Sequence, residues 1–262
     1  MSTFEALKGL RIGCVQYLNS RPLIWGLDGV QLAHPRVLAQ ALRAGELDAA
    51  LVPVFELLRA PEQYVAVNGV AIASDGPVYS VFVSHERPLA QLHGVVGDPA
   101  SLSSIHLFQV LAKGALGLDL PLVAAQPGAE YGPELGHLWI GNQAIAHRLQ
   151  HANDKVFWDL GEAWTEWTGL PFVYAVWVLR RGLSDEPSVA DAFREIARAG
   201  VARIPEIAAD ESEFGLELAL EYLSRHIRFN LGANELAGLT RFRRELIQRG
   251  FLPDSQTQLE FV

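Results

Sequence analysis

The stretch RIGCVQYLNSRPLIWGL, Arg11–Leu27, decides the fold because it changes from a strand pattern to a helix pattern within a few residues. The apolar run from Ile12 to Val15 has the length of a buried strand. A polar group ending at Ser20 follows, and Ser20 is a candidate N-cap. Pro22 suits the first turn of a helix, where its missing N–H is not needed. The stretch therefore predicts a strand, a polar turn and a helix.

Such a junction is where open α/β folds bind ligands, beyond the carboxyl ends of strands and against helix N-termini. Asn19 offers a hydrogen-bond donor and an acceptor there, and Tyr17 and Ser20 offer hydroxyls. The alternative is that Asn19 and Ser20 only cap the helix, which is the commonest use of these residues. The stretch alone leaves both interpretations open.

A second junction of the same kind follows. The run from Leu47 to Val52 predicts a buried strand, and the residues from Val54 to Leu58 predict a short helix after Pro53. Helical spacing before it, ending at Gly45, predicts another helix. Strands that alternate with helices indicate βαβ units and a mostly parallel sheet.

Two further groups of hydroxyls stand out. Residues Val78–Ser84 predict a strand after the turn Ser74-Asp75-Gly76-Pro77, with Ser80 on the face of Val78 and Phe82. A strand serine usually bonds to backbone, so Ser80 is either structural or a ligand contact. Ser101, Ser103 and Ser104 precede a helix expected from about Ile105 to Ala115. They indicate either a simple cap or a cradle for a carboxylate or phosphate at the helix start.

Composition limits the classes of function. The chain has 262 residues, 50% of them hydrophobic, which is enough for two modest domains or one large one. Its net charge of −9 argues against a nucleic-acid partner. Cys14 is its single cysteine, so an intramolecular disulfide is impossible. The start, Met1 to Lys8, lacks the apolar core of a secretory signal, and no apolar run has the roughly 20 residues of a membrane helix. We therefore expect a cytoplasmic protein without a membrane span.

The pattern predicts two α/β lobes. Glu86-Arg87-Pro88 suggests a crossing between them, and the long strand-like run Pro171–Leu179 suggests the return. One lobe would comprise residues 1–87 and 174–262, and the other residues 88–173. The helical region after Val189 is expected to be scaffold, with Asn234 as the N-cap of its last helix. The polar junctions would converge on the cleft between the lobes, where ligands are often bound.

Several chemistries are not indicated. The chain has no glycine-rich phosphate loop after a strand and no Gly-x-Ser-x-Gly nucleophile motif. His147 and His151 lie four residues apart, but a further metal ligand at suitable spacing is missing. We expect neither a nucleotide cofactor nor a metal. The tryptophans 158, 164, 167 and 177 are expected in the core or in a pocket wall.

A set of motifs now occurs in one order along nearly the whole chain: Gln16-Tyr17-Leu18-Asn19-x-x-Pro22-Leu23, Gly45-Glu46-Leu47-Asp48, Asp75-Gly76-Pro77-Val78-x-Ser80, Ser101-x-Ser103-Ser104, Ile140-Gly141-Asn142-x-Ala144 and Trp164-x-Glu166-Trp167-Thr168-Gly169-Leu170-Pro171-Phe172. The motifs and their order resemble those of the chorismate dehydratases, which catalyse the first step of the futalosine route to menaquinone. Two positions depart from the family pattern. Asn142 stands where the family usually carries aspartate, and Ser103 stands where it carries threonine.

The resemblance implies a type II periplasmic-binding-protein-like fold, two lobes each with a mixed, mostly parallel sheet flanked by helices, and a lyase without a cofactor. Its substrate would be the dicarboxylate chorismate and its product 3-[(1-carboxyvinyl)oxy]benzoate. Asn19 and Ser80 are then the expected catalytic residues. The expected substrate-binding residues are Tyr17, Ser20, Ser74, Gly76, Ser101, Ser103, Ser104 and Asn142.

Two other functions stay open at this point. The first is a solute-sensing module of the same fold that performs no chemistry, which would need the same hydroxyl-lined cleft. The second is a sister enzyme acting on a futalosine derivative, which would need a longer pocket and a catalytic histidine that the motifs lack. The oligomeric state cannot be predicted from the chain.

Overall fold

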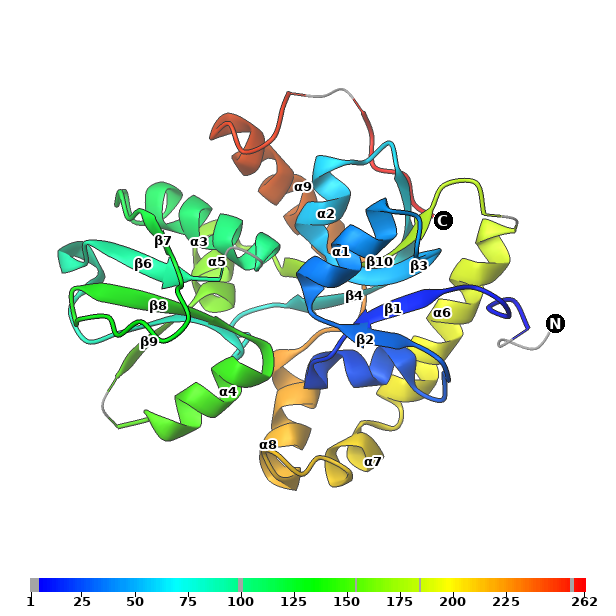
Figure 1. Ribbon diagram of the computed structural model, residues 1–262, viewed down its shortest axis with the longest axis horizontal. Coiled ribbons are helices and arrows are strands. Elements are labelled where there is room, and N and C mark those ends of the chain that lie inside the picture. Colours follow the sequence, from blue (N-terminus) through cyan, green and yellow to red (C-terminus); the bar gives the residue numbers. More distant parts are fainter. Residues whose placement is uncertain (1–4, 99–100, 154, 184, 255–256) are drawn as a thin grey trace.

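The computed structural model describes residues 5–98, 101–153, 155–183, 185–254 and 257–262. Residues 1–4 of the stretch Met1 to Lys8, and Pro99 and Ala100 ahead of the serine group, lie outside this range. Figure 1 shows two lobes side by side, the smaller one carrying β5 to β9 and α3 to α5. The predicted two-lobed α/β architecture is confirmed.

The first lobe contains a five-stranded sheet in the order β2-β1-β3-β10-β4. Its strands are β1 (Ile12–Val15), β2 (Gln31–Ala33), β3 (Ala49–Pro53), β4 (Tyr64–Ser74) and β10 (Phe172–Arg180). Only β10 runs against its neighbours, so the sheet is mixed and mostly parallel. Its helices are η1 (Leu18–Ile24), α1 (Pro35–Arg43), α2 (Val54–Arg59), α6 (Glu186–Val201), α7 (Ile204–Ala209), α8 (Leu216–Glu221), η3 (Tyr222–His226) and α9 (Ala233–Gln248).

The second lobe repeats this plan with the order β7-β6-β8-β5-β9. Its strands are β5 (Val81–His85), β6 (Gly94–Gly97), β7 (Leu122–Ala124), β8 (Leu135–Ile140) and β9 (Val156–Asp159). Here only β5 is antiparallel to its neighbours. Its helices are η2 (Leu89–Gln91), α3 (Leu102–Gly114), α4 (Gly141–Gln150) and α5 (Leu160–Thr168).

The chain crosses between the sheets earlier than Glu86–Pro88, where the sequence suggested it. Since β4 ends at Ser74 and β5 already pairs with β8 and β9, the first crossing lies at residues 75–80. The return lies between α5 and β10, at residues 169–171. Gly169, with φ of +68°, ends α5 there in the left-handed conformation that favours glycine.

Three local predictions were wrong by a few residues. Ser20 does not cap a helix, because η1 already begins at Leu18 and Ser20 lies inside it. Ser80 is not in a strand, because β5 begins one residue later. The last helix begins at Ala233 and not after Asn234, because the Glu235 carboxylate accepts the N–H of Gly232 and starts the helix two residues earlier.

Aromatic side chains join elements of the first lobe to one another and to α5 of the second lobe. Trp177 on β10 stacks on Phe193 of α6 with ring centroids 4.1 Å apart. Trp164 of α5 meets Phe172 and Phe242 edge to face, at 5.3 and 5.9 Å. Trp164 and Trp177 are fully buried, as expected for core tryptophans. These contacts attach α5, α6 and α9 to β10, the strand that returns from the second lobe.

The outer edge of β4 is closed by two distant segments of the same chain. The N–H groups of Ala66 and Asn68 donate to the carbonyls of Glu260 and Val262, at 2.9 and 2.8 Å. Further along, the N–H of Ala73 donates to the carbonyl of Arg228 at 2.9 Å. The longest strand of the first sheet is therefore paired on both sides.

Candidate functional site

A narrow cavity of about 70 Å³ lies between the lobes, at the carboxyl ends of β1, β3 and β8. It is lined by Val15, Tyr17, Asn19, Pro35, Pro53, Ile72, Val78, Ser80, Val81, Ser101, Leu102, Ser103, Ser104, Ile140, Gly141, Tyr174 and Ala175. The structure thus brings together six of the ten predicted site residues. Among the described residues, none that lines this cavity is a lysine, arginine, histidine, aspartate or glutamate.

Asn19 and Ser80 meet at a shared partner, the hydroxyl of Tyr222. The Asn19 amide nitrogen donates to Tyr222 Oη at 3.0 Å, and Ser80 Oγ lies 2.7 Å from the same oxygen. All three residues are buried. Burial raises the pKa of Tyr222 well above its ordinary value, so its hydroxyl stays protonated at neutral pH.

The serine group lies at the start of α3. Ser103 Oγ accepts the N–H of Phe55 at 3.1 Å, so a residue of the second lobe bonds to α2 of the first. Ser101 and Ser104 are also buried against the cavity. The first N–H groups of an α-helix have no acceptor within the helix and are available to a ligand. This end of the cavity can therefore hold a carboxylate with neutral donors.

Three helices begin at the cavity wall. Pro35, Leu102 and Gly141 are the first residues of α1, α3 and α4, and each lines the cavity. The N-terminus of a helix carries the equivalent of roughly +0.5 charge. The cavity is therefore favourable for an anion, although the chain as a whole carries a net charge of −9.

The segment that carries Ser80 is held by the carboxylate of Asp159. Its oxygens accept the N–H groups of Val78 and Tyr79, at 3.0 and 2.8 Å. Tyr79 has a φ of +68°, which is unusual for a residue with a side chain. Arg148 lies 3.7 Å from the same carboxylate, with its guanidinium 4.6 Å from the centre of the Tyr79 ring. These bonds draw residues 78 and 79 out of the β5 ladder, which explains why the strand begins only at Val81.

Tyr17 forms part of the wall between the cavity and the outside. Its ring lies so close to Gly141 that a side chain there would come within 2.6 Å of it. Burial, with a smaller effect of Asp98, raises the pKa of Tyr17 to about 12. A cavity of about 70 Å³ is smaller than the 300–1,000 Å³ typical of small-molecule pockets. A ligand of ordinary size therefore fits only if the walls separate. Residues 75–80 and 169–171 are the segments where the chain crosses between the lobes.

Four predicted binding residues do not line the cavity. Ser20 Oγ lies 2.6 and 2.7 Å from the carbonyl oxygens of Val15 and Tyr17, which share its single proton, and this contact stabilises the start of η1. Ser74 Oγ bonds the carbonyl of Gly76 and the hydroxyl of Tyr174, at 3.2 and 3.1 Å. The N–H of Gly76 donates to Thr165 Oγ1 at 2.9 Å. Ser20, Ser74 and Gly76 therefore use their polar groups within the protein, and they stabilise segments that lie next to the cavity.

Asn142, the fourth of them, links the lobes. Its amide oxygen accepts the N–H of Leu18 at 2.9 Å, and its amide nitrogen donates to Glu213 at 3.0 Å. Asn142 therefore supplies from α4 the cap that η1 lacks within its own segment. This explains why η1 begins at Leu18, which the local sequence did not predict.

An Asn142→Asp variant is expected to lower the free energy of unfolding by about 1 kcal/mol at neutral pH. The new carboxylate keeps the bond to Leu18 but loses the donor to Glu213 and repels it. Urea unfolding of the single variants and of Asn142→Asp/Glu213→Gln measures the coupling. Recovery of most of the loss in the double variant is expected, and an undiminished loss would show that the charge pair has no part in it.

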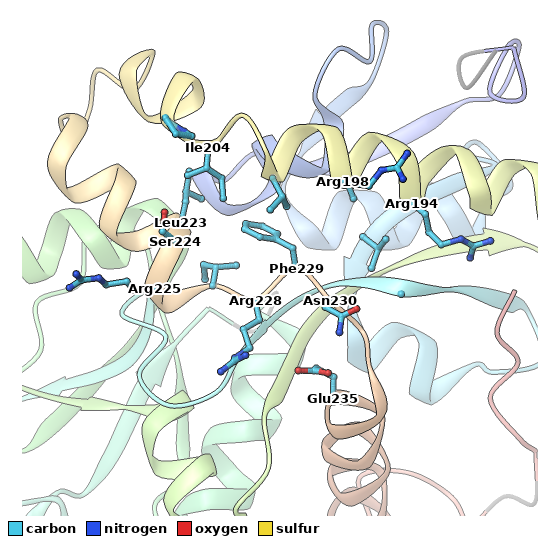
Figure 2. Close-up of a pocket in the computed structure, with 16 residues that line it drawn as sticks. Arg194, Arg198, Ile204, Leu223, Ser224, Arg225, Arg228, Phe229, Asn230 and Glu235 are labelled. Carbon is cyan, nitrogen blue, oxygen red and sulfur yellow. The ribbon is translucent and has the colours of Figure 1, made fainter.

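A more spacious depression of the surface lies elsewhere, on the outer side of the first lobe (Figure 2). Its volume is about 840 Å³, and it is lined by Arg194, Arg198, Arg225 and Arg228 among others. Arg194 and Arg228 pair with Asp191 and Asp75, at 2.6 and 2.9 Å. Figure 2 shows the arginine side chains pointing in different directions and not toward a common point. A ligand site needs converging polar groups, so the cavity between the lobes is the better candidate.

The described part of the chain contains neither a clustered metal site nor a membrane-spanning helix. Among those residues, no group of three or more histidine, cysteine, aspartate or glutamate side chains is arranged to hold a metal ion. No helix formed by them is both long and apolar enough to cross a bilayer.

Tyr222 and Tyr174 are site residues that the sequence did not indicate. Tyr222 belongs to a region that we expected to be scaffold, and its apolar neighbours Ala219 and Leu223 make it look like a core residue. The signal that singles it out is its place in the π-helical turn η3, because such turns are frequent at functional sites. That feature is visible only in the structure.

Comparison with known proteins identifies the family to which this chain belongs. A family model described as menaquinone biosynthesis matches residues 10–248. The chain belongs to the menaquinone-biosynthesis family. A curated relative is the chorismate dehydratase of Thermus thermophilus, which is 29% identical over 256 residues, covering 90% of this chain and 94% of that protein. The resemblance recognised in the sequence motifs is thereby confirmed.

Solved structures support the fold of this member of the menaquinone-biosynthesis family. A protein from Archaeoglobus fulgidus superposes with a TM-score of 0.73 at 13% identity, over 93% of this chain and 98% of that one. The aliphatic sulphonate-binding protein SsuA of Escherichia coli does so with a TM-score of 0.58 at 14% identity, over 94% of each chain. At these identities the likeness concerns the fold alone, and it confirms the predicted periplasmic-binding-protein-like architecture.

Proposed function

We propose that this chain is a chorismate dehydratase, a carbon–oxygen lyase that converts chorismate to 3-[(1-carboxyvinyl)oxy]benzoate and water. The proposal rests on membership of the menaquinone-biosynthesis family and on the relative from Thermus thermophilus. The observation that carries it is a cavity lined by neutral hydrogen-bond donors and by the first residues of three helices. Such a cavity suits a ligand that carries carboxylates and a hydroxyl.

In the proposed reaction, a base removes the proton from the ring carbon that bears the enolpyruvyl ether. The electron pair of that C–H bond forms a ring double bond as the hydroxyl on the neighbouring carbon leaves. The departing hydroxide and the proton become water, and the ring becomes aromatic. The conjugated diene passes developing negative charge to the ring carboxylate. Stabilisation of that charge is therefore the main task of the protein.

Ser103, Ser104 and the first N–H groups of α3 would hold the ring carboxylate, since Leu102, Ser103 and Ser104 line the cavity. Asn19 and Ser80 are both hydrogen-bonded to Tyr222 Oη, and they would face the leaving hydroxyl. Tyr17 and Ser101 would close the remaining wall. In this proposal, charge stabilisation and contact with the leaving group are assigned to different residues of one cavity.

The base in this mechanism is the enolpyruvyl carboxylate of the substrate itself. Among the described residues that line the cavity, the only titratable side chains are Tyr17 and Tyr174. Burial raises the pKa of both phenols, so neither loses its proton readily at neutral pH. A carboxylate held next to the reacting C–H within one molecule gains a large effective concentration.

Incubation of the purified protein with chorismate tests the proposal. Formation of an aromatic product, followed by absorbance and identified by mass spectrometry, is the expected result. Stoichiometric binding of chorismate without turnover would instead support a solute-sensing module. Turnover of a futalosine derivative but not of chorismate would assign the sister reaction. In the proposed function, this step would open the futalosine route to menaquinone.

A further inference from the structure

Among the residues that the structure describes, the hydroxyl of Tyr222 is the one side-chain group that forms hydrogen bonds to both Asn19 and Ser80. It comes from η3, roughly two hundred residues further along the chain than Asn19. The tyrosine is only 1% exposed, so its hydroxyl cannot turn to solvent for a partner. Its hydrogen bonds must therefore be made with Asn19 and Ser80.

The direction of these bonds follows from what each atom can do. The amide nitrogen of Asn19 can only donate, so Tyr222 Oη accepts from it. The single phenolic proton of Tyr222 then has one neighbour to bond, Ser80 Oγ at 2.7 Å. If Ser80 donated instead, the buried proton of Tyr222 would be left unsatisfied, which costs free energy. Tyr222 therefore donates to Ser80.

This order of protons leaves two groups free for a ligand. The proton of Ser80 is not used by Tyr222 and is available to donate into the cavity. The amide oxygen of Asn19 is buried and accepts no hydrogen bond from any part of the chain that the structure describes. Both residues line the cavity. The pair thus presents one donor and one acceptor to a ligand. If the oxygen and nitrogen of the Asn19 amide were exchanged, Asn19 would be the donor and Ser80 the acceptor.

The tyrosine is itself held against the crossing segment. His226 of η3 bonds the carbonyl of Pro77 at 2.9 Å, and its ring lies 5.1 Å from the ring of Tyr79. Asp159 fixes the backbone of Val78 and Tyr79 from the other side. The bond of His226 to Pro77 and the bonds of Asp159 to Val78 and Tyr79 therefore hold the segment before Ser80. They thereby fix the 2.7 Å distance between Tyr222 Oη and Ser80 Oγ.

We propose that Tyr222 is a positioning residue that orients Asn19 and Ser80 as an acceptor and a donor for one hydroxyl of the ligand. A hydroxyl is the neutral group that can accept from Ser80 and donate to Asn19 at the same time. This inference rests on the proposed function, in which that hydroxyl is the ring hydroxyl that leaves as water. Tyr222 does not touch the substrate, and its effect passes through the pair.

Tyr222→Phe tests the inference because it removes the hydroxyl and keeps the ring. For chorismate turnover, kcat is expected to fall about 10- to 100-fold and KM to rise up to about 10-fold, because the hydroxyl contact is weakened in the bound substrate as well as in the transition state. Tyr64→Phe is the matched control, since Tyr64 is a buried tyrosine whose hydroxyl bonds Glu56 at 3.1 Å, away from the cavity. Its kcat is expected to stay within about twofold of the original chain. A lower melting temperature for Tyr222→Phe with unchanged kcat would reduce Tyr222 to a core residue and overturn the inference.

A binding measurement separates this inference from the proposed function. The original chain is expected to bind chorismate about 10-fold more tightly than the analogue that lacks the ring hydroxyl, and Tyr222→Phe is expected to lose this preference. A preference that Tyr222 controls, without any turnover, would overturn the proposed reaction and leave the inference standing. Equal affinity of the original chain for the two compounds, or binding of neither, would overturn the inference.

Discussion

Replacing Asn19 with alanine is expected to lower kcat for chorismate dehydration about 10²- to 10³-fold, the usual loss when a preorganised polar group at a reacting centre is removed. The amide lines the cavity, and its oxygen is buried without a protein partner among the described residues. It therefore has an interaction to offer only when a ligand is present. KM is expected to rise less than kcat falls, because the contact strengthens as the hydroxyl leaves.

Steady-state kinetics on chorismate, with Asn68→Ala as the control, measures this effect. Asn68 is exposed, and its side-chain oxygen accepts the N–H of the neighbouring Gly69 at 2.9 Å. Its replacement is expected to leave kcat unchanged within about twofold. Full turnover by Asn19→Ala would remove Asn19 from the proposed mechanism.

Replacing Asp159 with alanine is expected to lower the free energy of unfolding by about 3–5 kcal/mol, the loss expected when a buried charge partner is removed. The carboxylate accepts the N–H groups of Val78, Tyr79, Gly161 and Glu162, at 3.0, 2.8, 3.0 and 3.2 Å. Its removal leaves these donors and the partly buried Arg148 without their acceptor. The segment that carries Ser80 would lose its anchor, so activity should fall with stability.

Urea unfolding of Asp159→Ala and Asp159→Asn measures this loss. The asparagine keeps one acceptor oxygen, so a smaller loss is expected, and this variant gives a result even if the alanine variant does not fold. Asp75→Ala is the control, because Asp75 pairs with Arg228 on the surface and should contribute less than about 1 kcal/mol. Equal stability of Asp159→Ala and Asp75→Ala would show that Asp159 does not anchor the crossing.

Elements with strong local patterns could be predicted from the sequence. The apolar run Ile12–Val15 is β1, and Gly45 follows α1 with a φ of +72°, as expected of a glycine that ends a helix. Strand length failed as a guide at Val78–Ser84, because the first residues of this run bond a carboxylate 80 positions away along the chain. Local pattern carries no information about such a partner.

Part of the candidate site could also be predicted from the sequence. Polar residues after strands led to Asn19 and to the serines of α3, because open α/β sheets bind ligands beyond the carboxyl ends of their strands. The same reasoning also selected Ser20 and Asn142, whose side chains are used within the protein. Tyr222 was missed because it stands among apolar residues at helical spacing, and only tertiary packing brings its hydroxyl to Asn19.

The closed edge of β4 bears on how this molecule behaves among its own copies. An exposed sheet edge offers a row of unpaired amides and carbonyls, which is a template for aggregation. In β4 those groups already pair with residues 228–229 and 260–262 of the same chain. Because residues 228–229 and 260–262 occupy this edge, β4, the longest strand of the first sheet, is blocked there from pairing with a strand of a neighbouring molecule.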